Sequence, residues 1–386
     1  MKTSCLRDIA LVMSLCSILL FWRLGDLPFY SRGEPREGLV VKEMNASGNW
    51  ILPRVNGEYI PSKPPLFHWL ALLCGAAFGR IDEFTLRLPS ALLAAAGALL
   101  IYAAGRALWG GRAGLAAATV LATTAEWWQA GTDTQVDMTL AFFIAAANLY
   151  FYFLYRRREF GFSPSLGLAL LLGLAALAKG PVGIAVPCLA IFIFLVLRRD
   201  LGFIKKLHPL VGAAVILLTA GSWYAAALWQ GGPAFFFRQI VDENFRTAAG
   251  TYGHHQPVYY YLPILLANNL PWSLFFPPLA LFLYSQRRRL AERDLSFLLV
   301  WFFVVLIFFS ASLGKRGVYI LPLYPALALL FGAWWQELEN TQALGGPAAR
   351  WIGFLIAASC LLALTLLFFY FARVHGTVDR SPLAFS

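Results

Sequence analysis

Charged side chains stand beside long apolar runs at several points in this sequence. Among the carboxylates, Glu34 lies in YSRGEPREG, and Asp133 and Asp137 lie four residues apart in TDTQVD. If that segment is helical, the two aspartates share one face, where a cation, a metal ion or a proton must relieve their repulsion. This pattern predicts carboxylates that take up a proton or bind an ion. The alternative for each is an ordinary helix-start or helix-capping carboxylate.

Cations occur in comparable positions. Lys63 stands in SKPPL, where two prolines hold the backbone extended, and Lys179 stands in AKGPVG between two apolar runs. Lys315 and Arg316 form a pair in LGKRGVY. Together these residues could surround an anion, and phosphate is the candidate because lysine and bidentate arginine are its usual protein partners. The alternative is that they snorkel at helix ends.

Two further groups could assist this chemistry. Arg36 is two residues from Glu34 and close enough to pair with it. His254 and His255, in TYGHHQP, could bind a metal ion or exchange protons, but neighbouring histidines do not easily share one ion. A hydrogen-bonding loop is the alternative for this pair. The sequence therefore leaves a divalent metal open and commits to no cofactor.

The composition determines what kind of scaffold must position these residues. Of 386 residues, 59% are hydrophobic and 13% are charged, a balance that excludes an ordinary water-soluble domain of this length. The net charge of +11 resides in short clusters between apolar runs, which argues against a nucleic-acid partner. The five cysteines show no paired spacing that would indicate a disulfide framework or a CxxC metal site. We predict a single all-α integral membrane domain over residues 1–386.

Repeated apolar runs are long enough to cross about 30 Å of hydrocarbon as helices. Eleven such transmembrane helices are predicted, at 8–24, 88–107, 113–129, 138–155, 163–178, 181–197, 209–229, 258–284, 295–312, 317–336 and 351–373.

Basic connections alternate with these runs. Clusters of arginine and lysine follow only even-numbered runs, at 106–112, 156–158, 198–206 and 287–293. The positive-inside rule therefore predicts a cytoplasmic N-terminus and places the candidate residues at the outer boundary of the membrane. The apolar segment 64–80 would invert this order if it crossed the membrane, so we expect it to form an interfacial helix on the outer surface.

Two outer loops are predicted to be long, at 25–87 and 230–257. In the first, Pro35 can open a surface helix over 36–46. The chain stops a few residues after the eleventh run, so no C-terminal soluble domain is expected. Charges of both signs gathered on one side of the bilayer indicate a polar cavity that opens outward.

Several strings resemble, in order, those of a known family. RGEPREGLVVKEMNASGNWILPRVNGEYIPSKPPLFHWL is similar to the first outer loop of the lipid-linked-sugar glycosyltransferases related to the lipid A aminoarabinose transferase and the protein O-mannosyltransferases. RLPSALLAA, VDMTLAFF, AKGPVGIAVP, GHHQPVYYYLPILLANNLPWSL and GKRGVYILPLYPALALL follow in the family's order. No single string is specific, but the ordered set covers most of the chain to about residue 330.

The resemblance implies a membrane fold of the GT-C type, a polyprenyl-phosphate sugar as donor, and an active site at the outer surface. The first loop of this family usually carries an Asp–Glu pair. Here Gly33 stands at the Asp position and Glu34 matches the Glu, so the identity of the base is open. Ser62 stands where the aminoarabinose transferases tend to carry a glutamate, which weakens the case for zinc on the histidines.

Sugar transfer from a lipid phosphate needs a carboxylate that takes the acceptor's proton and cations that stabilise the departing phosphate. We expect Glu34 or Asp137 to be the base and Asp133 to be a supporting carboxylate. We also expect Arg36 to orient Glu34. The expected substrate-binding residues are Arg36, Lys63, Lys179, His255, Lys315 and Arg316.

The expected protein is a glycosyltransferase of the bacterial inner membrane whose active site faces the periplasm. Its acceptor would be lipid A, another glycolipid or glycan, or a protein. Two alternatives remain. One is a non-catalytic protein that binds lipid-linked sugar, because Gly33 removes a residue that the family uses. The other is a transporter, against which the lack of half-chain symmetry argues.

Overall fold

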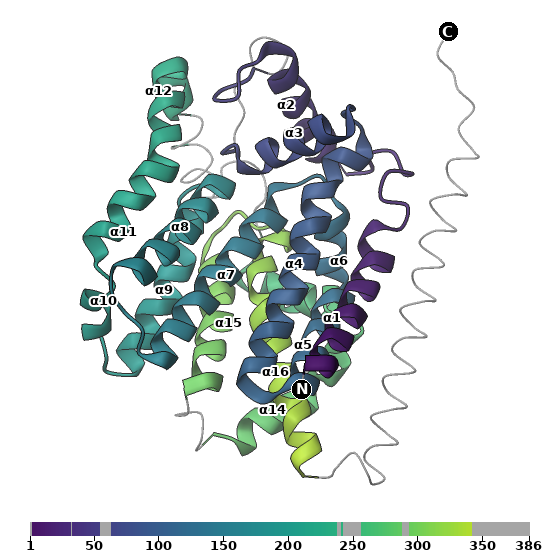
Figure 1. Ribbon diagram of the computed structural model, residues 1–386, viewed down its shortest axis with the longest axis vertical. Coiled ribbons are helices and arrows are strands. Elements are labelled where there is room, and N and C mark those ends of the chain that lie inside the picture. Colours follow the sequence, from purple (N-terminus) through teal and green to yellow (C-terminus); the bar gives the residue numbers. More distant parts are fainter. Residues whose placement is uncertain are drawn as a thin grey trace.

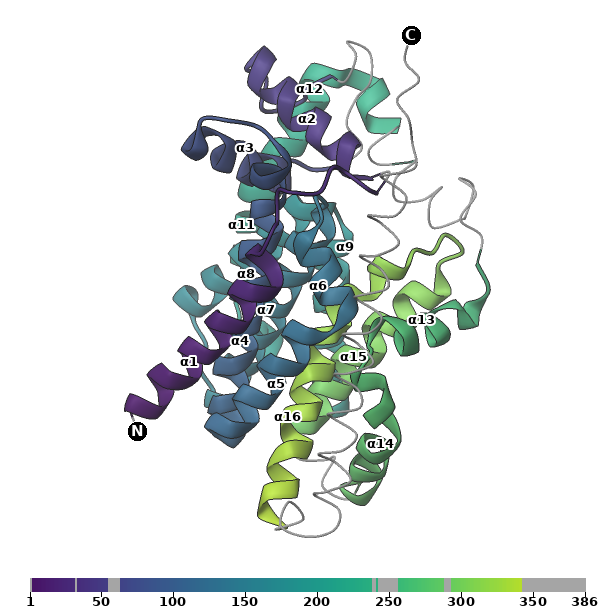
Figure 2. The same cartoon turned by 90° about the vertical axis from the view of Figure 1, so that its right-hand side faces the viewer.

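The computed structural model describes residues 2–31, 33–54, 63–237, 241, 256–287 and 293–341. Regular structure in these ranges is helical throughout, and the longer helices lie side by side in an elongated bundle (Figure 1 and Figure 2). The prediction of an all-α fold is confirmed.

Sixteen α-helices are described in these ranges, together with shorter 3-10 and π segments. The α-helices are α1 (Lys2–Cys16), α2 (Gly33–Ser47), α3 (Leu66–Phe78), α4 (Glu83–Trp109), α5 (Gly111–Thr123), α6 (Ala125–Thr132), α7 (Val136–Arg157), α8 (Phe162–Lys179), α9 (Val182–Leu197), α10 (Gly202–Lys206), α11 (Pro209–Ile216), α12 (Ser222–Phe235), α13 (Tyr261–Asn268), α14 (Phe276–Ser285), α15 (Arg293–Ala311) and α16 (Tyr324–Asn340). The shorter segments are η1 (Ser17–Phe21), η2 (Leu217–Gly221), η4 (Val258–Tyr260), η5 (Trp272–Phe275) and η6 (Gly317–Leu323).

Seven of the described helical segments are long and apolar enough to cross a membrane. An eighth is added if Val258–Asn268 and Trp272–Ser285, which meet at 105°, form one bent span. The predicted run 113–129 is divided between α5 and α6, because Thr124 adopts an extended conformation (φ −69°, ψ 126°). The predicted run 181–197 forms α9, which has 16 residues. The run 351–373 lies outside the described residues, so the number eleven is not confirmed.

Helices α2 and α3 lie together at one end of the bundle (Figure 1). The 13 residues of α3 rise only about 20 Å, too little to cross a bilayer. The apolar faces of α2 and α3 form a small separate core with Leu86 of α4. This core contains Val40, Val41, Met44, Ala71, Leu72 and Leu86. These helices therefore have a separate hydrophobic contact with the top of α4, as the predicted surface helices require.

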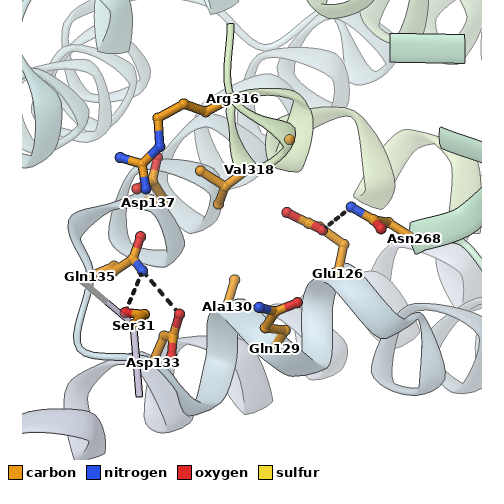
Figure 3. A pocket seen from close by; sticks show the side chains of 11 residues that line it. Ser31, Glu126, Gln129, Ala130, Asp133, Gln135, Asp137, Asn268, Arg316 and Val318 are labelled. Atoms are coloured by element: carbon orange, nitrogen blue, oxygen red, sulfur yellow. Dashed lines mark hydrogen bonds between the residues drawn. The ribbon is translucent and has the colours of Figure 1, made fainter. Parts of the chain in front are cut away.

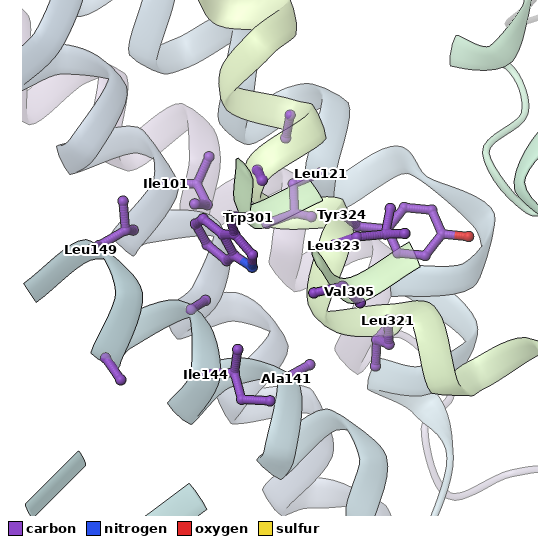
Figure 4. Close-up of a cluster of buried hydrophobic side chains, with 14 of the residues drawn as sticks. Ile101, Leu121, Ala141, Ile144, Leu149, Trp301, Val305, Leu321, Leu323 and Tyr324 are labelled. Atoms are coloured by element: carbon purple, nitrogen blue, oxygen red, sulfur yellow. The ribbon is translucent and has the colours of Figure 1, made fainter. Parts of the chain in front are cut away.

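Close contacts between small residues hold α4, α5 and α16 together. A Cβ added to Gly114 of α5 would lie 2.5 Å from the carbonyl oxygen of Tyr102 in α4. A Cβ added to Gly332 of α16 would lie 2.7 Å from the carbonyl oxygen of Ala113. Such glycine contacts let membrane helices approach closely without a hydrophobic driving force in lipid. Large apolar side chains, including Trp301 at 0% exposure, fill the adjoining interior (Figure 4).

The basic connections between helices and the connections that carry candidate site residues lie at different ends of the bundle. The basic segments 106–112, 156–158 and 198–206 lie at the end of the bundle opposite α2 and α3 (Figure 1). The connection from α6 to α7 and the turn after α8 lie at the end that carries α2 and α3. This separation matches the alternation predicted from the charges.

Candidate active site

The short helix α6 is the central element of the site, and indole hydrogen bonds fix it against its neighbours. Trp127 Nε1 donates to the carbonyl oxygen of Ala94 at 3.3 Å, and Trp128 Nε1 donates to that of Leu19 at 2.7 Å. A Cβ at Gly97 would lie 2.6 Å from the Trp127 ring, so α4 carries a glycine where this ring packs. The polar face of α6 is therefore held in one orientation.

A cavity of about 290 Å³ lies along this face of α6 (Figure 3). Its lining combines α6 with the segment before α2, the start of α7, the end of α13 and the start of η6. The lining residues are Ser31, Glu126, Gln129, Ala130, Asp133, Gln135, Asp137, Asn268, Arg316, Gly317 and Val318.

Asp133 and Asp137 both line the cavity, but not as two positions of one helix. Asp133 is extended (φ −102°, ψ 150°) after the end of α6, and α7 begins only at Val136. The conditional prediction of a shared helical face is therefore wrong. Asp133 is 4% exposed, and Gln135 Nε2 donates to its Oδ2 at 2.9 Å. Burial raises the pKa of Asp133 to about 6, while a hydrogen bond with Tyr30 opposes part of this rise.

Cations gather at the end of the cavity where α7 starts. Lys179, the last residue of α8, donates from Nζ to Asp137 Oδ1, and its ammonium lies 4.3 Å from the ring centroid of Tyr319. Figure 3 shows the guanidinium of Arg316 extending toward Asp137. Two of the predicted phosphate-binding residues are thus close to one of the predicted carboxylates.

Glu34 lies next to the cavity rather than in its lining, and it is 0% exposed. Its Oε1 accepts from Arg87 Nε at 2.8 Å and from the backbone N–H of Thr134 at 3.2 Å. Its Oε2 accepts from the backbone N–H of Tyr30 at 3.2 Å and from Arg87 Nη2 at 3.3 Å. Arg87 donates to three further backbone carbonyls, those of Leu24, Leu27 and Pro28. Glu34 and Arg87 therefore tie the start of α2 to α4 and to the loop that carries Asp133.

Arg36 does not take the position expected for it. Its Nη2 donates to Glu37 Oε1 at 2.6 Å, and the arginine found on Glu34 is Arg87. His68 of α3 contacts the other oxygen of Glu37 at 2.8 Å. Burial opposes ionisation of Glu37, but His68 and Arg36 outweigh it and lower its pKa to about 2. Arg36 thus belongs to a contact that joins α2 to α3.

Two other predicted cations lie outside the cavity lining. Lys315 is 2% exposed, and its Nζ donates to the carbonyl oxygens of Gln256, at 2.9 Å, and Ser312. It therefore fixes the turn that presents Arg316. Lys63 is half-buried, just before the start of α3.

The candidate residues His254 and His255 lie outside the described residues, as does Ser62, so the placement of the histidines stays a prediction. Within the described ranges, His, Cys, Asp and Glu side chains form no group of three or more that could hold a metal ion.

The sequence reasoning missed several residues of this region, among them Arg87, Glu126 and Gln135. Glu126 interrupts a predicted apolar run in TAEWWQA, and Arg87 stands at the start of another in RLPSALLAA. An ionisable residue inside such a run is expensive to bury and marks a functional or paired position. That signal could have found Glu126 and Arg87, whereas nothing in the sequence distinguishes Gln135.

The arrangement of helices is similar to that of solved membrane glycosyltransferases. It matches ArnT from Cupriavidus metallidurans bound to undecaprenyl phosphate with a TM-score of 0.78 and 26% identity, covering 92% of this chain and 63% of that one. It also matches the oligosaccharyltransferase AglB from Archaeoglobus fulgidus, in complex with an inhibitory peptide and a dolichol-phosphate, with a TM-score of 0.60 and 17% identity, over 94% and 54% of the two chains. The second match shows the fold alone. The protein is an integral membrane protein with a fold of the GT-C class.

Sequence comparisons give the family. Residues 62–224 match the family model described as dolichyl-phosphate-mannose-protein mannosyltransferase. The undecaprenyl phosphate-alpha-4-amino-4-deoxy-L-arabinose arabinosyl transferase of Aeromonas salmonicida is 30% identical over 379 residues, 95% of this chain and 68% of its own length. The enzyme of the same description from Aeromonas hydrophila is 30% identical over 368 residues, 94% of this chain and 66% of its own length. The chain belongs to this GT-C glycosyltransferase family of aminoarabinose transferases and their mannosyltransferase-like relatives, as the sequence motifs predicted.

Proposed function

We propose that this protein is a glycosyltransferase that moves a sugar from a polyprenyl-phosphate donor to an acceptor in the cavity along α6. The observation that carries the proposal is the meeting, in one cavity, of the carboxylates of Asp133 and Asp137 with Arg316 and the neighbouring Lys179. The relatives described as undecaprenyl phosphate aminoarabinose transferases support it, as does the structure of ArnT with undecaprenyl phosphate. The transferred group is then a pentosyl or hexosyl unit.

In the proposed reaction, an acceptor oxygen attacks the anomeric carbon of the sugar. The bond from that carbon to the phosphate oxygen breaks, its electrons leave with the phosphate, and a carboxylate takes the acceptor's proton. Phosphate is a good leaving group and needs no acid. The protein therefore has to supply one base and a set of cations.

Asp133 is the base in this proposal, although the sequence favoured Glu34 or Asp137. A base needs a lone pair directed at the substrate, whereas both oxygens of Glu34 accept hydrogen bonds from protein groups. The Lys179 ammonium occupies one oxygen of Asp137. Asp133 lines the cavity, and its pKa of about 6 suits proton transfer near neutral pH.

The position of Gly33 supports this assignment. A Cβ at Gly33 would lie 3.4 Å from Gln135 Nε2, the same nitrogen that donates to Asp133 Oδ2. The aspartate that the family resemblance places at position 33 would thus reach the region that the carboxylate of Asp133 occupies here. We propose that Asp133 takes over that role in this chain.

Arg316 and Lys179 hold the phosphate in this proposal. Arg316 offers a planar fork of donors, and the Lys179 ammonium adds a point charge next to it. Asp137 and the ring of Tyr319 position Lys179. Lys315 acts on the phosphate indirectly, by fixing the turn before Arg316. The roles of Lys63 and His255 in substrate binding stay predictions.

The proposed location is the bacterial inner membrane, with a cytoplasmic N-terminus and the cavity on the periplasmic side. The alternation of basic connections with apolar helices supports this orientation. The acceptor would be lipid A, another glycolipid or glycan, or a protein.

The proposal is tested by mixing purified protein with radiolabelled polyprenyl-phosphate sugars and envelope acceptors. Arg316→Gln and Lys179→Gln should weaken donor binding, and Asp137→Asn should do so through Lys179. Glu339→Gln, a change of the same kind at the opposite end of the bundle near Arg112, serves as the control. Binding of donor by the wild-type protein with no transfer to any acceptor would favour a non-catalytic binding protein instead.

A further inference from the structure

Two side chains donate hydrogen bonds to the carboxylate of Asp133, and the proposed reaction gives neither of them a role. Gln135 donates from Nε2 to Asp133 Oδ2 at 2.9 Å, and the hydroxyl of Tyr30 donates to the same carboxylate. Tyr30 comes from the segment before α2, whereas Gln135 directly precedes α7. Hydrogen bonds to an ionised carboxylate are charge-assisted and stronger than those between neutral groups. Both contacts therefore favour the ionised form, which is the form that a base needs.

The backbone before α7 places Gln135 beside Asp133 in the cavity wall. Asp133 (φ −102°, ψ 150°) and Gln135 (φ −145°, ψ 150°) are both extended, and side chains two residues apart in an extended segment point to the same side. Both line the cavity. Gln135 occupies the N-cap position of α7, but its side chain makes no capping hydrogen bond. Its amide nitrogen reaches Asp133 and, at 3.5 Å, Ser31 Oγ instead, so capping does not account for this side chain.

The orientation of the Gln135 amide follows from its partner. An ionised carboxylate only accepts hydrogen bonds, so the amide nitrogen must face Asp133. Figure 3 shows the amide oxygen on the other side, toward Asp137 and Arg316. A glutamate of the same size at position 135 would remove the donor and bring a second negative charge against Asp133.

Tyr30 is held at both its backbone and its ring. Its backbone N–H donates to Glu34 Oε2 at 3.2 Å, and its ring centroid lies 5.8 Å from the guanidinium carbon of Arg87. Glu34 and Arg87 form the buried ion pair that joins the start of α2 to α4. The same ion pair therefore fixes the phenol that reaches Asp133.

The groups around Asp133 act in opposite directions on its pKa. Burial raises this pKa most, and the negative charges of Glu34 and Asp137 raise it further, whereas Tyr30 and Arg87 lower it. Arg87 is already paired with Glu34, so the hydrogen-bond donors carry much of the stabilisation of the Asp133 charge. The ionisable groups on this side of the cavity are Tyr30 and Glu34 at the start of α2, Arg87 of α4, Glu126 of α6, Asp137 of α7 and Arg316 before η6.

We infer that Gln135 and Tyr30 are positioning residues of the transfer reaction, which hold the Asp133 carboxylate in the cavity wall in its proton-accepting form. They act through Asp133 and exchange no proton with the substrate. This inference rests on the proposed function, because it takes Asp133 as the base.

The test is the pH dependence of transfer, at saturating donor, by Gln135→Met, Gln135→Glu and Tyr30→Phe. Each substitution keeps the approximate size of the side chain. The wild-type rate should be half its maximum near pH 6, the pKa of Asp133. Loss of one charge-assisted hydrogen bond should raise this midpoint by about one pH unit in Gln135→Met and Tyr30→Phe. The added charge in Gln135→Glu should raise it by about two units or more.

Two residues at the opposite end of the bundle provide matched controls, Gln286→Met and Tyr284→Phe. Gln286 Nε2 also donates to a carboxylate, Glu337 Oε1, at 3.3 Å. The ring of Tyr284 also lies beside an arginine, with the Arg287 guanidinium carbon 4.2 Å from its centroid. Both controls should keep the wild-type midpoint, because neither touches the cavity.

Infrared titration measures the same pKa without any substrate. The protonated-carboxyl band of Asp133 is obtained as the difference between each protein and the same protein carrying Asp133→Asn. We expect its midpoint to be lowest in the wild type, higher in Tyr30→Phe and Gln135→Met, and highest in Gln135→Glu. Unchanged midpoints in all three variants, with a rate that falls equally at every pH, would overturn the inference. If the wild-type protein transfers no sugar, the proposed function fails, and the infrared midpoints still decide whether Gln135 and Tyr30 hold Asp133 ionised.

Discussion

Removal of Arg87 should damage this protein more than removal of any exposed arginine in the described part of the chain. Arg87 is 2% exposed, and its guanidinium donates to both oxygens of Glu34 and to three carbonyls before α2. In Arg87→Met the carboxylate of Glu34, at 0% exposure, is left without its cation. Breaking a buried pair in this way costs about 3–5 kcal/mol. The exposed pair of Arg23 and Asp26, at 54% and 52% side-chain exposure, provides a comparison that should cost about 0–1 kcal/mol.

The assay is reversible unfolding in mixed micelles of Arg87→Met, Glu34→Gln and their double variant, with Arg23→Met as the control. We expect both single variants to lose about 3–5 kcal/mol, and the double variant to lose clearly less than their sum because the two groups interact. Transfer by the folded fraction of Glu34→Gln should stay within about tenfold of the wild-type rate, since Glu34 positions the Asp133 loop and takes no proton. If Glu34→Gln keeps its stability and loses transfer, Glu34 is the base and the reasoning is refuted.

Three further predictions concern pH and packing. Burial raises the pKa of Asp133 to about 6, so the wild-type transfer rate at saturating donor should fall about tenfold per pH unit below pH 6. A transfer rate that does not change from pH 7 to 4 would contradict the role of Asp133 as base. The pKa of Glu37 is lowered from 4.5 to about 2, so the stability that its ionised form contributes should be present above about pH 4.5 and be lost as the pH falls toward 2. The melting temperature, measured as a function of pH, should fall over this range in the wild-type protein and fall less in Glu37→Gln. Equal slopes in the two proteins would exclude this contribution of ionised Glu37 to stability. Gly114→Leu should no longer elute as a single monodisperse peak in size-exclusion chromatography, because its Cβ would lie 2.5 Å from the carbonyl oxygen of Tyr102. Gly202→Ala, whose Cβ meets open space, should elute as the wild-type protein does.

The architecture was largely accessible from the sequence, because lipid forces it. Backbone polar groups in hydrocarbon must be satisfied within a helix, so long apolar runs identify most spans. The predictions of individual helices were wrong where a bend in the backbone divides an apolar run that the composition presents as one continuous helix. Thr124 separates α5 from α6, and the segment between Val258 and Ser285 bends by 105°. Periodicity and hydropathy do not register such breaks, because the residues on both sides remain apolar.

The sequence predicted several of the residues that line the site, but it did not predict which of them form ion pairs with one another. Asp133 and Asp137, on either side of the junction between α6 and α7, line one cavity with Arg316, which comes from a distant position just before η6. The partner of Glu34 was assigned to Arg36, its neighbour in sequence, but Arg87 of α4 occupies that place. Which of two arginines reaches a carboxylate depends on how α2 packs on α4, and this packing is not encoded in local spacing.

The most direct test of the proposed site is transfer from a polyprenyl-phosphate sugar by wild-type protein, by Asp133→Asn, and by the double variant Gly33→Asp with Asp133→Asn. We predict that Asp133→Asn binds the donor normally and transfers at least about 100-fold more slowly. The double variant should recover a substantial part of the lost rate, because a carboxylate at position 33 would again lie beside Gln135. Transfer by Asp133→Asn at the wild-type rate would contradict the assignment of this cavity as the place where the acceptor loses its proton.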